Sequence, residues 1–280
     1  MGNETLVEIV RTHPGYQEYH SPEFDRVLEA MLRVDRKDFL PEKAPVEVTV
    51  SYLIFSQMIQ AYNVLVSKDE TDDIKGKAFA AMLSLIKMLA DSSIIVIAQP
   101  RDSAYDDNPL KIGYGQTCSQ PSLVAFMAYW LELKEGMKVL EVGTGCGYSA
   151  AITCHLIAPS GRLVTAEIIP ELEELGRSNL EAHFGKEGLE RRLKVISGDG
   201  SIGLETDAPF DRIYLAAGVD ESFDPFKLVR YLNPERGILL FPEQKGDLIK
   251  QIYEKGNLID AKRYGDGKIE FVPLLRINTR

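Results

Sequence analysis

From Pro109 onward, short apolar segments alternate with stretches of helical periodicity, and this alternation limits the possible folds more than any other feature. Five segments have the composition of strands: Lys138–Val142, Arg162–Glu167, Leu193–Ser197, Phe210–Leu215 and Gly237–Phe241. Strands separated by helices form βαβ units, which build a mainly parallel, doubly wound sheet of the α/β class. A helix is expected between the last two, over Phe226–Leu232. Two later segments, Leu248–Tyr253 and Phe271–Leu274, are expected to add antiparallel strands.

The chain ahead of this α/β region is predicted to divide in two. Residues 1–43 form an N-terminal helical unit packed on the core, in which Ser21 and Pro22 begin a helix as N-cap and first residue. Residues 44–103 form an insertion, and residues 104–280 form the α/β core. We therefore expect one core with two additions at its N-terminal side.

The insertion has two apolar stripes at helical spacing, near residues 55–62 and 79–89, separated by a charged turn. They predict a helical hairpin, followed by a short strand or buried segment at Ile94–Ile97. The hairpin could be a packed decoration. It could also be a lid over the site or an interface between copies of the chain, because both apolar stripes need burial.

A glycine-rich loop joins the first predicted strand to the following helix. It reads Gly143-Thr-Gly-Cys-Gly147. Glycines allow a sharp turn and a close approach to the backbone, and the helix N-terminus offers unpaired N–H groups. By itself the motif fits a ligand site and a plain tight turn equally well. The candidate cofactor residues here are Glu141, Gly143, Thr144, Gly145 and Gly147.

Two acids at the ends of the next strands favour the ligand site. Glu167 ends the second strand about 20 residues downstream, where a carboxylate can accept hydrogen bonds from two ribose hydroxyls. Asp199, followed by Gly200, ends the third strand, where it can reach an adenine ring. The Gly-x-Gly-x-Gly spacing differs from the Gly-x-Gly-x-x-Gly spacing of dinucleotide sites. The loop and acids together predict S-adenosylmethionine as the cofactor.

The composition excludes several other classes of protein. The net charge is −10 and the isoelectric point is near 5.1, which argues against nucleic acid or an anionic membrane as the main partner. No apolar run is long enough to span a bilayer, and no signal peptide is apparent, so we expect a cytoplasmic protein. Three cysteines without a CxxC pair and four histidines without an HExxH pattern predict neither a metal site nor a disulfide framework.

Several motifs, in order, resemble the protein-L-isoaspartate O-methyltransferase family. The most specific is Gly115-Gln-Thr-Cys-Ser-Gln-Pro121, which precedes the glycine loop. The others are Gly198-Asp-Gly200, Ala208-Pro-Phe-Asp211 with Ala216-Ala-Gly218, and Phe271-Val-Pro-Leu274. The match covers roughly residues 20–43 and 104–276. The family usually has an apolar residue at the position of Cys118 and often a serine at that of Cys146, so both thiols are departures from its pattern.

The resemblance implies a Rossmann-like methyltransferase fold and an activity in protein repair, that of a protein-L-isoaspartate(D-aspartate) O-methyltransferase. Family members transfer a methyl group from S-adenosylmethionine, which becomes S-adenosylhomocysteine, to the α-carboxylate of L-isoaspartyl residues in damaged proteins and peptides. By the same resemblance, Ser119 matches the catalytic serine, and Thr117 and the backbone near Val272 match substrate-binding positions. From the residues alone, Ser119 could instead cap the helix that follows Pro121.

The chemistry agrees with these assignments. A sulfonium methyl group is already activated and a carboxylate is ionised at neutral pH, so the enzyme needs no strong base. Hydroxyl groups can orient the carboxylate by hydrogen bonding. Two alternatives remain: a methyltransferase with another acceptor, or an inactive S-adenosylmethionine-binding homologue. The acidic charge and the sequence Leu215-Ala-Ala-Gly218 weigh against RNA and amino-group methylation, and the intact Thr117 and Ser119 weigh against an inactive protein.

Overall fold

The computed structural model describes residues 2–49, 93–220, 223–243 and 245–275. The chain divides into two compact units. The larger unit consists of Met1–Glu42 and Gln99–Arg280, and the smaller unit of Lys43–Ala98. Within the described residues, no helix is both long enough and apolar enough to cross a membrane.

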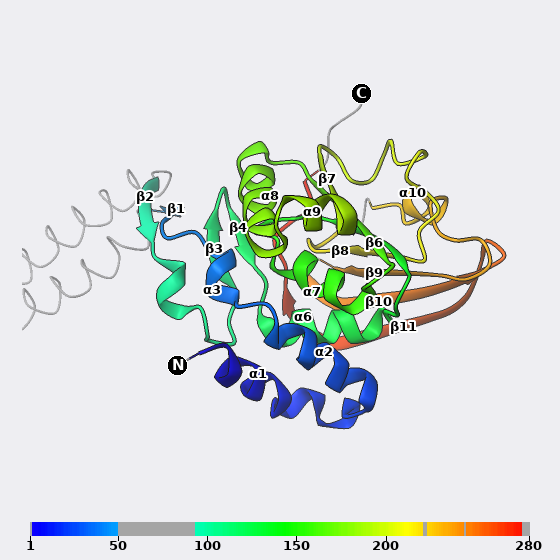
Figure 1. The fold of residues 1–280 in the computed structure, drawn as a ribbon, viewed down its shortest axis with the longest axis horizontal. Coiled ribbons are helices and arrows are strands. Elements are labelled where there is room, and N and C mark those ends of the chain that lie inside the picture. Colours follow the sequence, from blue (N-terminus) through cyan, green and yellow to red (C-terminus); the bar gives the residue numbers. More distant parts are fainter. Residues whose placement is uncertain (1, 50–92, 221–222, 244, 276–280) are drawn as a thin grey trace, which may run out of the picture. The chain divides into compact units, whose positions relative to one another are not determined.

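The larger unit contains helices, short 3-10 turns and strands (Figure 1). Its helices are α1 (Asn3–Arg11), α2 (Pro22–Leu32), α3 (Arg36–Phe39), α6 (Pro121–Trp130), α7 (Tyr148–Ile157), α8 (Pro170–Phe184), α9 (Lys186–Arg192) and α10 (Phe226–Val229), with 3-10 turns η1 (Pro14–Tyr19) and η2 (Pro100–Ser103). Its strands are β3 (Leu110–Gly113), β4 (Gln116–Cys118), β5 (Lys138–Val142), β6 (Arg162–Glu167), β7 (Leu193–Ser197), β8 (Arg212–Leu215), β9 (Gly237–Pro242), β10 (Lys245–Glu254) and β11 (Asn257–Glu270).

Seven of these strands form one sheet in the order β7-β6-β5-β8-β9-β10-β11. Strands β5 to β9 run parallel to one another, whereas β10 runs antiparallel to both β9 and β11. The predicted mainly parallel, doubly wound sheet is therefore confirmed. From β5 the chain adds β6 and β7 on one side of the sheet and then β8 and β9 on the other, so the strand order reverses at β5. In this class of sheet, ligands bind at the carboxyl ends of the strands where such a reversal occurs.

The parallel strands are buried on both faces. Neighbouring residues on a strand point to opposite sides, so Val139 and Leu163 join a core with α2, α6, α7 and α8, while Leu140 and Val164 join a second core. The second core also contains Phe210 and residues around α10. Near-continuous apolar strands of this kind are expected in a sheet that is covered on both faces.

The N-terminal helices belong to the first of these cores. Helix α2 begins as predicted, because Ser21 Oγ accepts a hydrogen bond from the N–H of Phe24 at 3.2 Å and Pro22 is the first helical residue. Phe24, Leu28 and Met31 on α2 are fully buried, and the helix packs on α6 and α7.

Two predictions about the C-terminal half were wrong. Residues Phe271–Leu274 do not form a strand: β11 ends at Glu270, and this segment pairs through an isolated parallel bridge between Pro273 and Gly218. The helix expected over Phe226–Leu232 ends at Val229. The carbonyl of Tyr231 accepts a hydrogen bond from the N–H of Phe210 at 2.8 Å, so the residues after Val229 pair with the segment before β8 and do not continue the helix.

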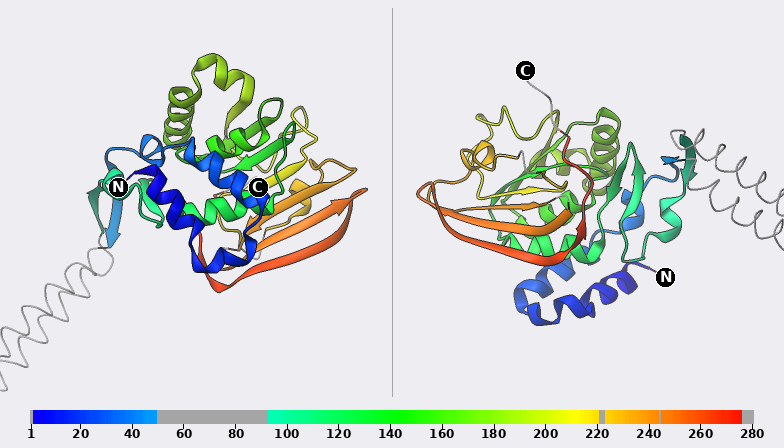
Figure 2. Two further views of the ribbon diagram at one scale, coloured as in Figure 1. Left: turned by 60° about the horizontal axis from the view of Figure 1, so that its bottom comes forward. Right: turned by 180° about the vertical axis from the view of Figure 1, so that it is seen from behind.

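The β10–β11 pair forms a long hairpin at one edge of the sheet, visible from both sides of the unit in Figure 2. A turn at Lys255 and Gly256, both with positive φ, joins the two strands. The pairing is interrupted by irregularities between Gly246 and Leu248 and between Ile252 and Tyr253.

The described part of the smaller unit is an antiparallel pair of strands, β1 (Ala44–Thr49) and β2 (Ser93–Ala98). Ala44 pairs with Ala98 and Thr49 with Ser93. The segment Ile94–Ile97, predicted as a short strand, lies within β2. The two apolar stripes of the predicted hairpin lie outside the described residues.

Candidate active site

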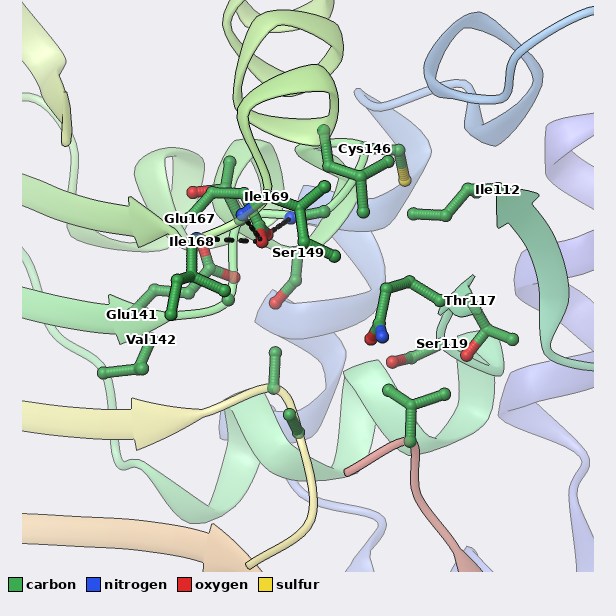
Figure 3. Close-up of a pocket in the computed structure, with 18 of the residues that line it drawn as sticks. Ile112, Thr117, Ser119, Glu141, Val142, Cys146, Ser149, Glu167, Ile168 and Ile169 are labelled. Carbon is green, nitrogen blue, oxygen red and sulfur yellow. Dashed lines mark hydrogen bonds between the residues drawn. The ribbon is translucent and has the colours of Figure 1, made fainter. Parts of the chain in front are cut away.

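A cleft lies at the carboxyl ends of β5, β6 and β8 and encloses about 770 Å³ of space, part of it open to solvent. Its walls bring together most of the residues that the sequence singled out (Figure 3). Glu141 and Glu167 stand at the strand ends, and Thr117 and Ser119 face them from the other side.

The glycine loop turns directly from β5 into α7. Gly143, Thr144 and Gly145 line the cleft. Gly147 does not line it: this residue is the N-cap of α7 with φ of 87°, and a Cβ atom there would lie 3.0 Å from Leu180 Cγ. Its role is therefore in the packing of α7 against α8, which the sequence pattern could not distinguish from cofactor contact.

Glu167 holds the glycine loop in place. One carboxylate oxygen accepts a hydrogen bond from the N–H of Gly145 at 2.8 Å, and the other accepts from the N–H groups of Ile168 and Ile169 at 3.0 and 3.1 Å. A carboxylate has about four lone-pair positions, so these three bonds leave acceptor capacity for a ligand. Only 6% of the residue is exposed, and what is exposed faces the cleft.

Glu141 lies at the floor of the cleft and is fully buried. Its carboxylate accepts hydrogen bonds from Thr165 Oγ1 at 2.6 Å and from the Tyr214 hydroxyl at 2.7 Å. Burial raises the pKa of Glu141 to about 7, although the hydrogen bonds from these hydroxyls oppose that rise and the nearby Glu167 adds to it. A carboxyl group that can gain or lose its proton near neutral pH therefore lies beneath the glycine loop.

The hydroxyl groups around Glu141 form a connected network. Thr165 pairs with Thr144 of the glycine loop at 2.7 Å, and Tyr214 pairs with Ser149 and Thr153 of α7, each at 3.1 Å. Burial raises the pKa of Tyr214 well above its ordinary value, so it remains a neutral donor. The sequence analysis missed this network, because Tyr214 lies 73 positions from Glu141 in the chain.

Thr117 and Ser119 flank the other side of the cleft. Thr117 lies on β4, which pairs with β3, and Ser119 follows that strand. Among the described residues, neither side-chain hydroxyl has a hydrogen-bond partner, so both are available to a ligand. Val272 lines the same cleft, and its carbonyl accepts a hydrogen bond from the N–H of Gly218 at 2.8 Å, which fixes the C-terminal segment beside the end of β8.

Ser119 does not cap helix α6. The N-cap is Gln120, which makes no capping bond with its own side chain. Asp107 serves instead: its carboxylate accepts hydrogen bonds from the N–H of Ser122 at 2.8 Å and from Gln120 Nε2 at 3.1 Å. Asp107, from a preceding loop, thus caps the helix in place of Ser119. The Ser119 side chain lines the cleft.

Arg36 fixes the backbone on this side. It is fully buried and donates hydrogen bonds to four carbonyl oxygens, including that of Ser119 at 3.1 Å. The other three are those of Ala104, Asp106 and Asn108, at 2.8 to 3.2 Å. No sequence pattern indicated this role, because an arginine near a helix start is ordinarily a surface residue.

At the end of β7, Gly200 lines the cleft but Asp199 does not. One oxygen of Asp199 accepts hydrogen bonds from the N–H and the hydroxyl of Ser201, at 2.9 and 2.7 Å. The cleft is also lined by residues that the sequence analysis did not single out, among them Gln116, Ser149 and Ile168. In the part of the chain that the structure describes, no group of three or more histidine, cysteine or acidic side chains could hold a metal ion.

Comparison with known proteins points to one family. Residues 88–278 match the family model described as protein-L-isoaspartate(D-aspartate) O-methyltransferase. The chain is 44% identical over 176 residues to protein-L-isoaspartate O-methyltransferase 2 of Archaeoglobus fulgidus, an alignment that covers 62% of this chain and 76% of that protein. It is 43% identical over 178 residues to the Methanopyrus kandleri protein-L-isoaspartate O-methyltransferase, covering 62% and 75%.

Solved structures support the fold. A putative protein-L-isoaspartate O-methyltransferase from Plasmodium falciparum, in complex with S-adenosyl-L-homocysteine, has a TM-score of 0.64 at 18% identity and covers 99% of both chains. A second structure with the name protein-L-isoaspartate O-methyltransferase has a TM-score of 0.61 at 21% identity, covering 97% of this chain and 65% of that one. Together with the family model, which matches most of the chain, and the motifs at the cleft, these comparisons confirm the resemblance seen in the sequence: the chain belongs to the protein-L-isoaspartate(D-aspartate) O-methyltransferase family.

Proposed function

We propose that the protein transfers a methyl group from S-adenosylmethionine to the α-carboxylate of L-isoaspartyl residues in damaged proteins and peptides. One observation carries the proposal: the free hydroxyls of Thr117 and Ser119 share a cleft with the glycine loop and Glu167. A protein that only bound the cofactor would have no need of the two hydroxyls. Family membership supports the same reaction.

The residues of the cleft fit S-adenosylmethionine. The backbone at Gly143, Gly145 and Gly198 lines the cleft without side chains, which leaves room for a ligand against the main chain. Glu167 could accept hydrogen bonds from ribose hydroxyls, and the Glu141 carboxyl group at the floor could hold the ammonium group of the cofactor. When bound, the cofactor supplies an activated methyl group.

The chain's contribution to the reaction is orientation. The α-carboxylate of an isoaspartyl residue is ionised at neutral pH and needs no base to make it a nucleophile. The Thr117 and Ser119 hydroxyls can donate hydrogen bonds to its two oxygens and hold one of them in line with the methyl group. Arg36 and the pairing of Val272 with Gly218 keep the surrounding backbone in place.

The test offers labelled S-adenosylmethionine with an L-isoaspartyl peptide and its L-aspartyl twin. We expect label only on the isoaspartyl peptide. Ser119→Ala should lower the turnover number about 10- to 100-fold while the dissociation constant for the cofactor changes little, because Ser119 faces the acceptor. Ser178→Ala, on an exposed position of α8, is the matched control. Cofactor binding without transfer to either peptide would overturn the proposal.

Three finer predictions remain proposals of the same kind. They are a cytoplasmic location, isoaspartyl proteins as the physiological substrates, and contact between copies of the chain through residues 44–103. Sedimentation of the whole chain beside a variant with that segment deleted would test the last of these.

A further inference from the structure

Two cysteines line the proposed active site. Cys118 lies at the end of β4, between Thr117 and Ser119, and Cys146 lies in the glycine loop, between Gly145 and Gly147. Both are free thiols, both line the cleft, and both are nearly fully buried. Each thiol affects the pKa of the other. A covalent bond between them would therefore join the acceptor side of the cleft to the cofactor loop.

The surroundings of this pair contain a cation without a carboxylate partner. Arg36 is fully buried, and within the described residues no acid lies within ion-pair distance of it. Its Nε has no hydrogen-bond partner of ordinary length there. Burial of a charge is expensive unless it is compensated, and carbonyl oxygens alone satisfy only part of this guanidinium. A thiolate would supply the missing negative charge.

A second unpartnered group lies beside the thiols. The hydroxyl of Tyr148 is buried and has no hydrogen-bond partner among the described residues, and the Arg36 guanidinium carbon lies 5.9 Å from the centre of its ring. Tyr148 interacts electrostatically with Arg36 and with both thiols. Burial raises its pKa, so it stays a neutral donor that could stabilise a thiolate.

These groups act differently on the two thiols. The interaction with Cys146 and then the charge of Arg36 lower the pKa of Cys118, against the effect of burial, whereas the pKa of Cys146 is raised. The thiolate is the reactive form of cysteine. Cys154 on α7 offers a contrast, because burial raises its pKa without an offsetting hydrogen bond.

We propose that Cys118 and Cys146 form a redox-sensitive pair that hydroperoxides convert to a disulfide, and that this disulfide slows methyl transfer. In the first step the Cys118 thiolate attacks a peroxide oxygen, the O–O bond breaks, and Cys118 sulfenic acid and hydroxide form. In the second step the Cys146 sulfur attacks the Cys118 sulfur and releases the sulfenic oxygen as water. Overall, two thiols and one hydrogen peroxide give one disulfide and two water molecules.

The disulfide would change the shape of the cleft. A disulfide would hold the two sulfur atoms about 2.05 Å apart and so tie β4 to the glycine loop. Thr117 and Ser119 would move with β4. Because a misplacement of about 1 Å can lower a rate about 100-fold, we expect the oxidised protein to transfer methyl groups 10- to 100-fold more slowly. A dithiol should restore the rate. This effect on transfer rests on the proposed function, whereas disulfide formation does not.

The first experiment measures thiols and needs no substrate. The full chain is treated with hydrogen peroxide, quenched, unfolded and alkylated, and the products are mapped by mass spectrometry. We expect the number of alkylated cysteines to fall from three to one, with a peptide that joins Cys118 to Cys146. Cys146→Ser should form no link and should leave Cys118 as a sulfenic acid that dimedone traps. Cys154→Ala should behave as the unmodified chain does.

Three outcomes would overturn the proposal. The first is that three free thiols remain after the treatment, and the second is that Cys154 is oxidised as fast as the pair. The third is a disulfide that leaves methyl transfer unchanged, which would remove the regulatory role. A chain that forms the disulfide but never methylates isoaspartyl peptide would instead contradict the proposed function and leave the thiol chemistry standing.

Discussion

The substitution Glu141→Gln should make the protein more stable at alkaline pH. The folded-state pKa of Glu141 is about 7, against an ordinary value of 4.5, because the carboxyl group is buried. The pKa of Glu141 thus differs by about 2.5 between the folded and unfolded chain. Since a pKa difference of one corresponds to about 1.4 kcal/mol, the free energy of unfolding changes by roughly 3 kcal/mol. This is a large fraction of the stability of an ordinary domain.

The sign of the effect follows from proton binding. Below pH 4.5 both the folded and the unfolded chain hold the proton on this carboxyl group, so it has no effect on stability. Between pH 4.5 and 7 the folded chain still holds the proton and the unfolded chain has lost it. The free energy of unfolding therefore falls as pH rises through this window, and the loss is complete above pH 7.

Glutamine should fit the network without this penalty. The hydroxyls of Thr165 and Thr144 pair in such a way that either could be the donor. Thr165 can therefore turn to accept a hydrogen bond from the glutamine amide and donate to Thr144, while the glutamine oxygen still accepts from Tyr214. The substitution removes a titrating group and keeps every hydroxyl paired.

Urea denaturation at a series of pH values from 4.5 to 8.5 measures the effect. Fluorescence of Trp130, the single tryptophan, reports on the unit that contains Glu141. The advantage of the variant over the unmodified chain should grow by about 3 kcal/mol from the acidic to the alkaline end. The exposed Glu187→Gln is the control for the loss of one negative charge. Parallel stability curves for Glu141→Gln and the unmodified chain would refute the reasoning.

Three further substitutions test other parts of the site. Glu167→Gln should weaken S-adenosylmethionine binding at least about tenfold by calorimetry, because hydrogen bonds to a charged acceptor contribute about 1.5–3 kcal/mol; an unchanged affinity would contradict this. Gly176→Ala should destabilise the fold by about 1–3 kcal/mol in urea, since its Cβ would lie 2.7 Å from the Gly145 carbonyl oxygen. Tyr214→Phe should cost about 1–3 kcal/mol by removing a donor to Glu141, and a neutral result would show that the network is loosely coupled.

The sequence was sufficient to predict the strands and their parallel arrangement. The pattern was clear because strands such as Lys138–Val142 are apolar on both faces and a glycine turn follows immediately. It failed where pairing is set by distant residues. Tyr231 pairs with Phe210 and shortens a predicted helix, and the segment around Pro273 pairs with Gly218 beyond the end of β8 and adds no antiparallel strand.

The candidate site was predicted where its residues lie in a local motif. Thr117, Ser119 and the glycine loop occur in short, recognisable segments. The residues that hold them do not: Arg36 is 83 positions from Ser119, and Tyr214 is 73 positions from Glu141. No periodicity or spacing connects such pairs, because the fold alone brings them together.

The two sides of the cleft share one physical arrangement. On one side, Glu167 binds the N–H of Gly145 in the glycine loop and the N–H groups of Ile168 and Ile169 that follow it. On the other, Arg36 fixes the backbone at Ser119, and the serine hydroxyl keeps no partner in the described structure. The backbone is therefore held before a ligand arrives, while groups that would contact the ligand retain hydrogen-bonding capacity. Such preorganisation raises the rate of transfer between a bound donor and a bound acceptor, because little conformational entropy is lost when they react.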